Sequence, residues 1–207
     1  MRLLPAIAMG VLLGSLLLAP AWAAAGSYRF FMEGLGHPLA APSHLLALVA
    51  LSVLLAQQVW QPSKIPQLMV LVQGGLTLVL VLASTLWYRP RPPVELFLLG
   101  LALVMGVLAI LRLSLPAGLL QLFALLVMVT IGLDSAAPRL PGLRGTGIQL
   151  YLLGTWCGVM LIWLAALLLS RLLRQLLDGL PLRILGSWIT AATLIVMTLQ
   201  LANLFRA

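Results

Sequence analysis

The chain has two histidines, His37 and His44, and they are the residues whose type and spacing point to chemistry. They lie seven positions apart, which is two turns of a helix, so both rings would project from one face. On a straight helix the rings would stand about 10.5 Å apart along the axis, which is too far for one metal ion. Pro38 and Pro42 argue against a straight helix here, and a bent or re-entrant segment would bring the rings closer.

Two interpretations of the histidines stay open at this point. Imidazole nitrogen binds nickel, copper, zinc and iron, so the pair could hold a metal ion. Alternatively, both histidines lie at the membrane interface, where they cap a helix or bond to a neighbour.

Acidic residues are nearly as scarce as histidines. The four are Glu33, Glu95, Asp134 and Asp178, and each falls at an expected helix end or in a loop. No two carboxylates share a helix turn, and Ser43 beside His44 would point away from the ring on a helix. No glycine-rich phosphate loop is present. The sequence therefore predicts that the chain is not an enzyme.

Composition indicates the solvent in which the chain folds. Hydrophobic residues make up 63% of the 207 positions and charged residues 8%, whereas soluble domains carry about 25% charged residues. We therefore expect an all-α, polytopic membrane helix bundle, because helices satisfy the backbone inside a bilayer and the apolar runs do not alternate as barrel strands do.

The net charge of +8 comes from scattered basic residues without an aromatic platform. This pattern favours contact with anionic lipid, and no nucleic-acid partner is expected.

The elements that would position the histidines are apolar segments of about 20 residues. Residues 1–25 resemble a signal peptide, with Arg2, an apolar stretch and alanines at the cleavage position. An uncleaved first anchor is the alternative, but the apolar stretch is short for a span. Residues 26–207 are expected to form one transmembrane domain of about six helices, over residues 43–60, 65–87, 94–113, 116–133, 148–170 (extending as helix to 177) and 182–204. A multi-pass protein of the bacterial inner membrane fits this layout.

Loop charges do not decide the orientation, since the two sets of loops carry similar numbers of basic residues. The signal peptide places residues 26–37 outside the cytoplasm, and we place the basic cluster of Arg171, Arg174 and Arg183 inside it.

Small residues indicate where helices pack closely. Gly74-Gly75 and the pair Gly154 and Gly158 are spaced for close helix packing. The single cysteine, Cys157, excludes an intrachain disulfide and a thiolate cluster.

The segment from Gly36 to Gln58 resembles the first transmembrane motif of the HupE/UreJ family of hydrogenase and urease accessory membrane proteins. That family shows a histidine, usually followed by proline, then five residues, then Asp-His and a Leu-Leu-Ala run. Here the matching residues are His37-Pro38, His44 and Leu45-Leu46-Ala47. The resemblance implies a cleaved signal, about six spans and uptake of nickel or cobalt for metalloenzyme maturation. Nickel or cobalt would then be the transported ion, with no cofactor bound permanently.

Two positions depart from the family pattern. Ser43 stands where the family has the aspartate, and residues 132–139 lack the histidine and glutamate of the family's second motif. Asp134 is the acid in that stretch that could replace them. The resemblance thus implies a divergent member with metal ligands at His37, His44 and Asp134.

Two hypotheses follow from these residues. The first is a permease for a divalent transition metal. The second is a non-transporting membrane accessory or scaffold subunit that has lost the metal ligands. The expected partners are the lipid bilayer, a divalent metal ion, and either a second copy of the chain or an accessory protein.

Overall fold

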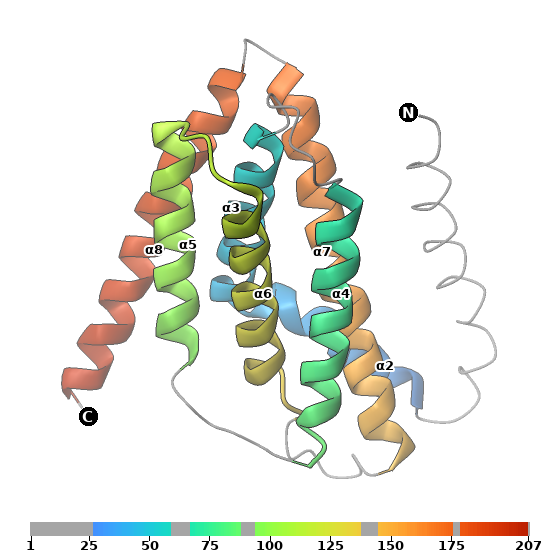
Figure 1. The fold of residues 1–207 in the computed structure, drawn as a ribbon. Helices are drawn as coiled ribbons and strands as arrows, with labels where there is room; N and C mark the ends of the chain where they lie inside the picture. Colours follow the sequence, from blue (N-terminus) through green and yellow to red (C-terminus); the bar gives the residue numbers. More distant parts are fainter. Residues whose placement is uncertain (1–26, 59–66, 88–93, 138–144, 176–178, 207) are drawn as a thin grey trace.

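The computed structural model describes residues 27–58, 67–87, 94–137, 145–175 and 179–206 (Figure 1). Within these ranges the chain forms helices and no strand, which confirms the all-α fold class. The helices are α2 (Ser27–Ala40), α3 (Pro42–Gln57), α4 (Gln67–Ser84), α5 (Val94–Leu111), α6 (Ala117–Asp134), α7 (Thr146–Gln175) and α8 (Leu180–Arg206). The predicted signal peptide lies outside the described residues.

Four of these helices are long and apolar enough to cross a membrane: α5, α6, α7 and the Leu180–Asn203 part of α8. Helices α2 and α3 pass the same test only as a bent pair, which would make a fifth span. Helix α4 is apolar but shorter. Helices α3 to α8 overlap the six predicted segments one to one, although the count of six membrane spans stays a prediction.

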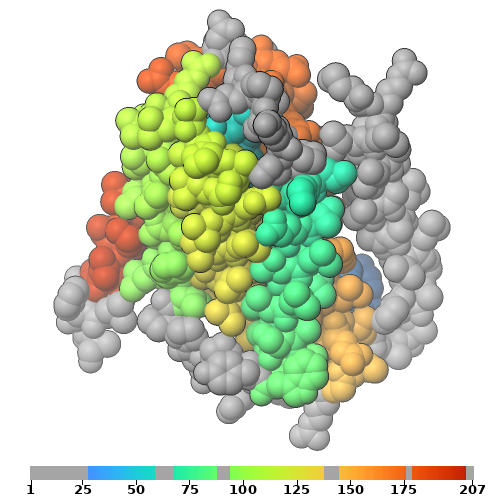
Figure 2. All heavy atoms as spheres, viewed as in Figure 1, coloured from blue at the N-terminus to red at the C-terminus, as the bar shows by residue number. Residues whose placement is uncertain are grey.

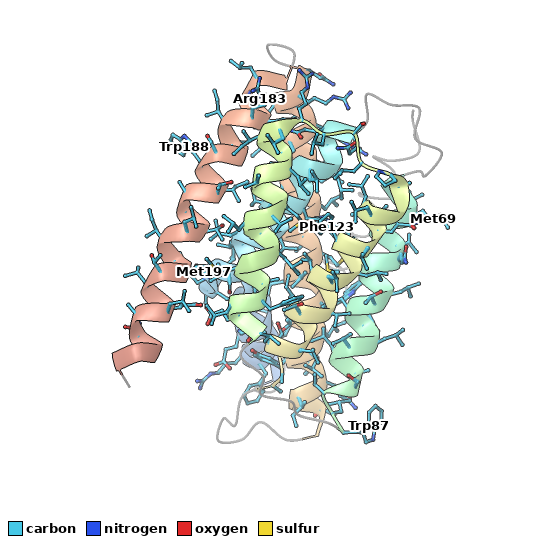
Figure 3. All side chains as sticks on the ribbon, turned by 60° about the vertical axis from the view of Figure 1, so that its left-hand side comes forward. Met69, Trp87, Phe123, Arg183, Trp188 and Met197 are labelled. Atoms are coloured by element: carbon cyan, nitrogen blue, oxygen red, sulfur yellow. The ribbon has the colours of Figure 1, made fainter. Side chains whose placement is uncertain are left out.

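Helices α3 to α8 form an elongated bundle, and α2 lies across it near one end (Figure 1). Helices α4, α5 and α6 cover one outer face (Figure 2). Large apolar side chains lie on the outside of the bundle, including Trp87 and Trp188, which are 84% and 72% exposed (Figure 3). This exposure is expected of a bundle whose surroundings are lipid rather than water.

Helix α3 lies inside the bundle, packed against α5, α6, α7 and α8. Its side chains from Ala50 to Ala56 are all buried, as expected for a helix whose sequence is apolar all round. Two side-chain amides at the C-terminal end of α3 form hydrogen bonds to neighbouring backbone. Gln57 Nε2 donates to the Ala109 carbonyl at 2.9 Å, and Gln58 Nε2 donates to the Leu113 carbonyl at 2.8 Å. These bonds help to fix α3 along its length, and with it the first turn that carries His44.

A sharp bend of 70° separates α2 from α3, and its cause is local. Proline disfavours the helical conformation in the residue before it, and Ala41, which precedes Pro42, is extended with φ −100° and ψ 105°. Pro42 itself occupies the first turn of α3, where a missing N–H costs nothing. The predicted bend is therefore confirmed at Pro42, whereas Pro38 lies inside α2 and does not end it.

Helix α2 is held against α7 by glycines on both helices. A Cβ atom at Gly34 would meet the Tyr151 carbonyl, and one at Gly154 would meet the Phe31 carbonyl. A Cβ atom at Gly158 would likewise meet the Leu35 carbonyl, one turn further along α2. The two backbones can approach this closely only where side chains are absent. The packing role predicted for Gly154 and Gly158 is confirmed, and the partner is α2.

Gly74 and Gly75 also lie at a helix contact, between α4 and α7. The Trp163 ring occupies the space that a Cβ atom at Gly74 would need, and Met160 packs against Gly75. The indole Nε1 of Trp156 donates to the Gly75 carbonyl at 3.2 Å. The glycine pair lies at a helix contact as predicted, but it makes room for large side chains of α7 and does not bring the two backbones together.

Candidate metal centre

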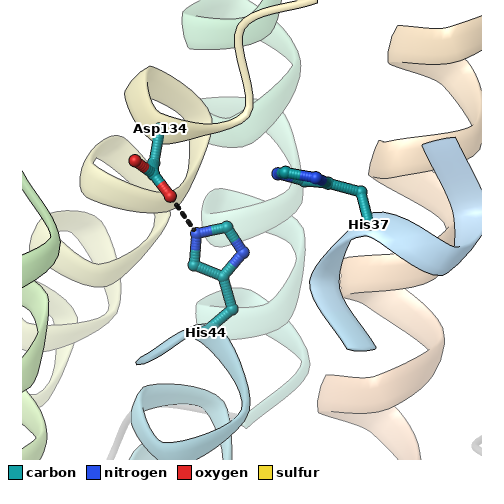
Figure 4. Close-up of side chains that lie close together, drawn as sticks. All are labelled: His37, His44 and Asp134. Carbon is teal, nitrogen blue, oxygen red and sulfur yellow. Dashed lines mark hydrogen bonds and ion pairs between the residues drawn. The ribbon is translucent and has the colours of Figure 1, made fainter. Parts of the chain in front are cut away.

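Three side chains from three helices meet at the end of the bundle where α2 crosses it: His37 of α2, His44 of α3 and Asp134 of α6 (Figure 4). One potential ligand atom from each lies within 4.8 Å of the other two. No other group of three or more His, Cys, Asp or Glu residues within the described ranges comes as close. The residues that the sequence singled out are thus brought together, although Asp134 lies 90 positions from His44.

His44 and Asp134 form a direct pair. The Nε2 atom of His44 lies 2.9 Å from Oδ2 of Asp134. The His44 side chain is fully buried, whereas the Asp134 side chain is 32% exposed. The other ring nitrogen, Nδ1, is buried and has no hydrogen-bond partner among the described residues. Histidines that bind a metal commonly donate their second N–H to a carboxylate, which orients the ring. Asp134 can therefore serve as a direct ligand or orient His44 for binding through Nδ1.

His37 approaches this pair from the side of α2, and its ring is directed toward it (Figure 4). The ring centroids of His37 and His44 are 5.5 Å apart, with the planes at 72°. The buried Nε2 atom of His37 also lacks a hydrogen-bond partner within the described part of the chain. Buried polar atoms are satisfied in the great majority of cases, and an unsatisfied one calls for an explanation such as a bound ion. His37 and His44 each present one such atom.

Helix termini add to the electrostatics of this region. The last turn of α2 contains His37, and α6 ends at Asp134, so the partial negative charge of two helix C-termini is directed to the site. Cations are stabilised at such ends. Together with the Asp134 carboxylate, these termini make the region attractive to a positive ion.

The dimensions suit a single ion after a small adjustment. Nitrogen and oxygen ligands bind zinc at about 2.0–2.2 Å, so two ligands of one such ion lie at most about 4.4 Å apart. The three ligand atoms lie within 4.8 Å of one another, and a modest side-chain rotation would bring them into range. A set of two imidazoles and one carboxylate suits borderline divalent metals, whereas calcium and magnesium prefer oxygen ligands alone.

Other residues around the site could not be anticipated from the sequence. The Tyr151 ring of α7 lies 6.1 Å from the His37 ring, because the glycine contact places α7 beside α2. Ser43 and Ser135 are fully buried neighbours of His44 and Asp134 in the chain, and neither hydroxyl has a hydrogen-bond partner within the described residues. Of these residues, only Ser43 could be linked to the site from the sequence, because it stands where the motif has an aspartate.

A comparison with known families gives the same family as the motif, and the match covers much more of the chain than the motif does. The family model for the HupE / UreJ protein matches residues 9–196. No curated protein and no solved structure matches the chain. The family match covers most of the 207 residues, including all three residues of the candidate site. The chain belongs to the HupE / UreJ family of membrane proteins.

Proposed function

We propose that this protein binds a divalent transition-metal ion, nickel or cobalt, at His37, His44 and Asp134 and takes part in its uptake across a bacterial inner membrane. The observation that carries the proposal is the meeting of three ligand atoms within 4.8 Å from three different helices. Buried, unpartnered nitrogens on both histidines, among the residues that the structure describes, support it. The ion is cargo, not a resident cofactor, and the proposal assigns no catalytic role to any residue.

The choice of nickel or cobalt follows from the donor atoms and from the family. Imidazole nitrogen favours borderline transition metals over calcium and magnesium, and this group of three residues contains no thiolate that would favour copper(I). Zinc and copper(II) would also accept these donors, so they serve as competitors in the binding experiment below. Family membership supports a membrane protein that handles metal.

The test begins with binding of NiCl₂ to the purified full-length protein, measured by calorimetry in detergent, with zinc and copper(II) titrated in parallel. The H37A/H44A variant removes both imidazoles, and we expect it to lose saturable nickel binding. Thr198→Ala, at an exposed position of α8 whose hydroxyl bonds to the Ile195 carbonyl of its own helix, is the control for purification and folding. Absence of saturable binding by the unmodified protein would overturn the proposal.

Accumulation of nickel and cobalt in cells then tests transport. Cells that express the protein should accumulate more metal than cells with an empty vector, and the H37A/H44A variant at matched membrane level should not. Metal binding without accumulation would refute the proposed transport but not the proposed metal binding.

A second candidate is an accessory subunit that holds metal at one face of the membrane without transporting it. The packing of α3 favours this candidate. Beyond His44 the helix presents Leu48, Leu51 and Leu54, all 0% exposed, and the fully buried Trp163 of α7 lies in the same core. An ion would have to cross this apolar layer. The accumulation experiment separates the two candidates.

A further inference from the structure

Helix α2 carries a second potential metal ligand, Glu33, that the sequence motif does not include. Glu33 lies four positions before His37 on the same helix. Residues four apart lie on one helix face, about one turn from each other. Pairs of metal-binding side chains at this spacing hold a single ion in helical metal sites. Glu33 and His37 therefore have the spacing of a two-ligand position.

The two carboxylate oxygens of Glu33 have different surroundings. Oε1 accepts a bond from Nε of Arg29 at 2.8 Å, and the Arg29 side chain is 79% exposed. Oε2 is buried and has no hydrogen-bond partner among the described residues. A buried anionic oxygen without a partner is costly. On this one helix, Glu33 Oε2 and His37 Nε2 are thus two buried ligand atoms, one turn apart, that lack partners in the described part of the chain.

The packing of α2 on α7 places the Glu33 turn of α2 beside the helix that also contacts His37. A Cβ atom at Gly34, the residue after Glu33, would meet the Tyr151 carbonyl, and the Tyr151 ring lies 6.1 Å from the His37 ring.

We propose that Glu33 and His37 form an outer cation position that receives a divalent transition-metal ion before His37, His44 and Asp134 bind it. This inference rests on the proposed function. Arg29 Nε donates to Oε1 of the Glu33 carboxylate. Exposed ion pairs between residues four apart contribute little stability, so an arriving divalent ion can displace the guanidinium at low cost. His37 is shared by the two positions, and rotation of its ring would move the ion inward.

The experiment measures nickel binding to the purified full-length protein by calorimetry with NiCl₂ alone. Glu33→Gln should weaken the apparent affinity by about tenfold or more, the scale seen when a carboxylate that supports a metal site is lost. Glu95→Gln makes the same chemical change in the first turn of α5 and should leave nickel binding unchanged. Arg29→Gln removes the competing cation and should raise the apparent affinity, whereas Arg183→Gln on α8 should not.

A second set of variants measures binding at the outer position alone. The H44A/D134N variant removes the inner ligands and should retain weak nickel binding that disappears in the triple variant with Glu33→Gln. Circular dichroism and gel filtration establish that each variant is folded. Unaltered binding by Glu33→Gln, or complete loss of binding in H44A/D134N, would overturn the outer position while the unmodified protein still binds nickel. Lack of binding by the unmodified protein would instead overturn the proposed function, and this inference with it.

Discussion

Ser43 stands beside His44 in the first turn of α3 and is fully buried. Its hydroxyl has no hydrogen-bond partner within the described residues. A buried hydroxyl without a partner does not repay the loss of its bonds to water. Ser43 therefore contributes neither a ligand charge nor, among the described residues, a hydrogen bond.

Ser43→Ala is accordingly expected to leave nickel affinity unchanged and the free energy of unfolding unchanged or slightly higher. Ser52→Ala is the matched comparison, because Ser52 Oγ donates to the Leu48 carbonyl at 2.7 Å. That change should cost about 0.5–1.5 kcal/mol, the usual net value of one hydrogen bond. Unfolding in detergent measures both, and a strong loss of nickel affinity in Ser43→Ala would show that the serine takes part in binding.

Asp134→Asn tests the charge of the third ligand while keeping the shape of the side chain. The amide can still bond to His44 but lacks the negative charge that favours a divalent ion. We expect nickel affinity, measured by calorimetry, to fall by about 10- to 100-fold, as for other carboxylates that support a metal-binding histidine. Glu95→Gln should have no effect, and an unchanged affinity in Asp134→Asn would remove Asp134 from the site.

At the scale of residues, the sequence identified His37 and His44 through the motif and Asp134 through the scarcity of other acids. It did not assign Glu33 to the site because Glu33 lies outside the motif, although its spacing of four from His37 is visible in the sequence. It could not identify Tyr151, because the packing of α2 on α7 brings Tyr151 to His37. Side chains that approach through tertiary packing leave no regular spacing in the sequence.

The contact between α2 and α7 is the element on which the position of His37 depends. Adding a methyl group at Gly154 would meet the backbone of Phe31, which cannot rotate away. Gly154→Ala should therefore displace α2 and destabilise the protein by about 1–3 kcal/mol. Nickel affinity should fall as well, although no ligand is changed.

Gly100→Ala on α5 is the control, since nothing lies within 4 Å of the added atom. Alanine is the better helix former, so this variant should be as stable as the unmodified protein or more so. Unfolding curves and nickel titrations of the two variants give the comparison. Equal nickel affinity in both would mean that the glycine contact does not position His37.

The sequence predicted the bend after α2, and Pro42 produces it by acting locally on the residue before it, whereas Pro38 lies inside α2. It did not predict that the aromatic segment from Tyr28 onward would pack along α7. The packing of this segment depends on Gly154 and Gly158, which lie far along the chain, and local patterns do not reveal such distant contacts.

The whole molecule has two ends of different character. Trp87 and Arg183 lie at opposite ends of the bundle (Figure 3), and Trp87 follows α4 at the end where α6 terminates with Asp134 (Figure 1). The basic residues Arg171 and Arg174 close α7 at that second end. The predicted orientation places this basic end in the cytoplasm, as positively charged flanks usually are, and the metal centre outside.

Cysteine labelling tests the orientation. In a Cys157→Ala background, Ser84→Cys adds a thiol at the exposed end of α4 near the metal centre, and Leu180→Cys adds one at the exposed start of α8. A membrane-impermeant maleimide should label Ser84→Cys in intact cells and Leu180→Cys only after permeabilisation. The reverse pattern would invert the orientation and place the metal centre on the cytoplasmic side.

At this scale the sequence predicted the fold class and the location of the apolar helices, since composition and run length decide both. It could not rank the helices by burial. Helix α3 lies inside the bundle and α8 at its edge (Figure 1), yet both are apolar and neither shows a clear polar face. Burial order depends on shape and contact between helices, not on the apolar content of each one.

The docking of α2 on α7 also sets the order in which the metal centre can be completed during synthesis. His37 and His44 leave the ribosome early, whereas Asp134 follows 90 residues after His44 and the glycines that receive α2 come later still. A nascent chain that has inserted only its first helices therefore holds both histidines without Asp134 and without the α7 surface that supports α2. The group of His37, His44 and Asp134 is therefore assembled only on a nearly finished protein.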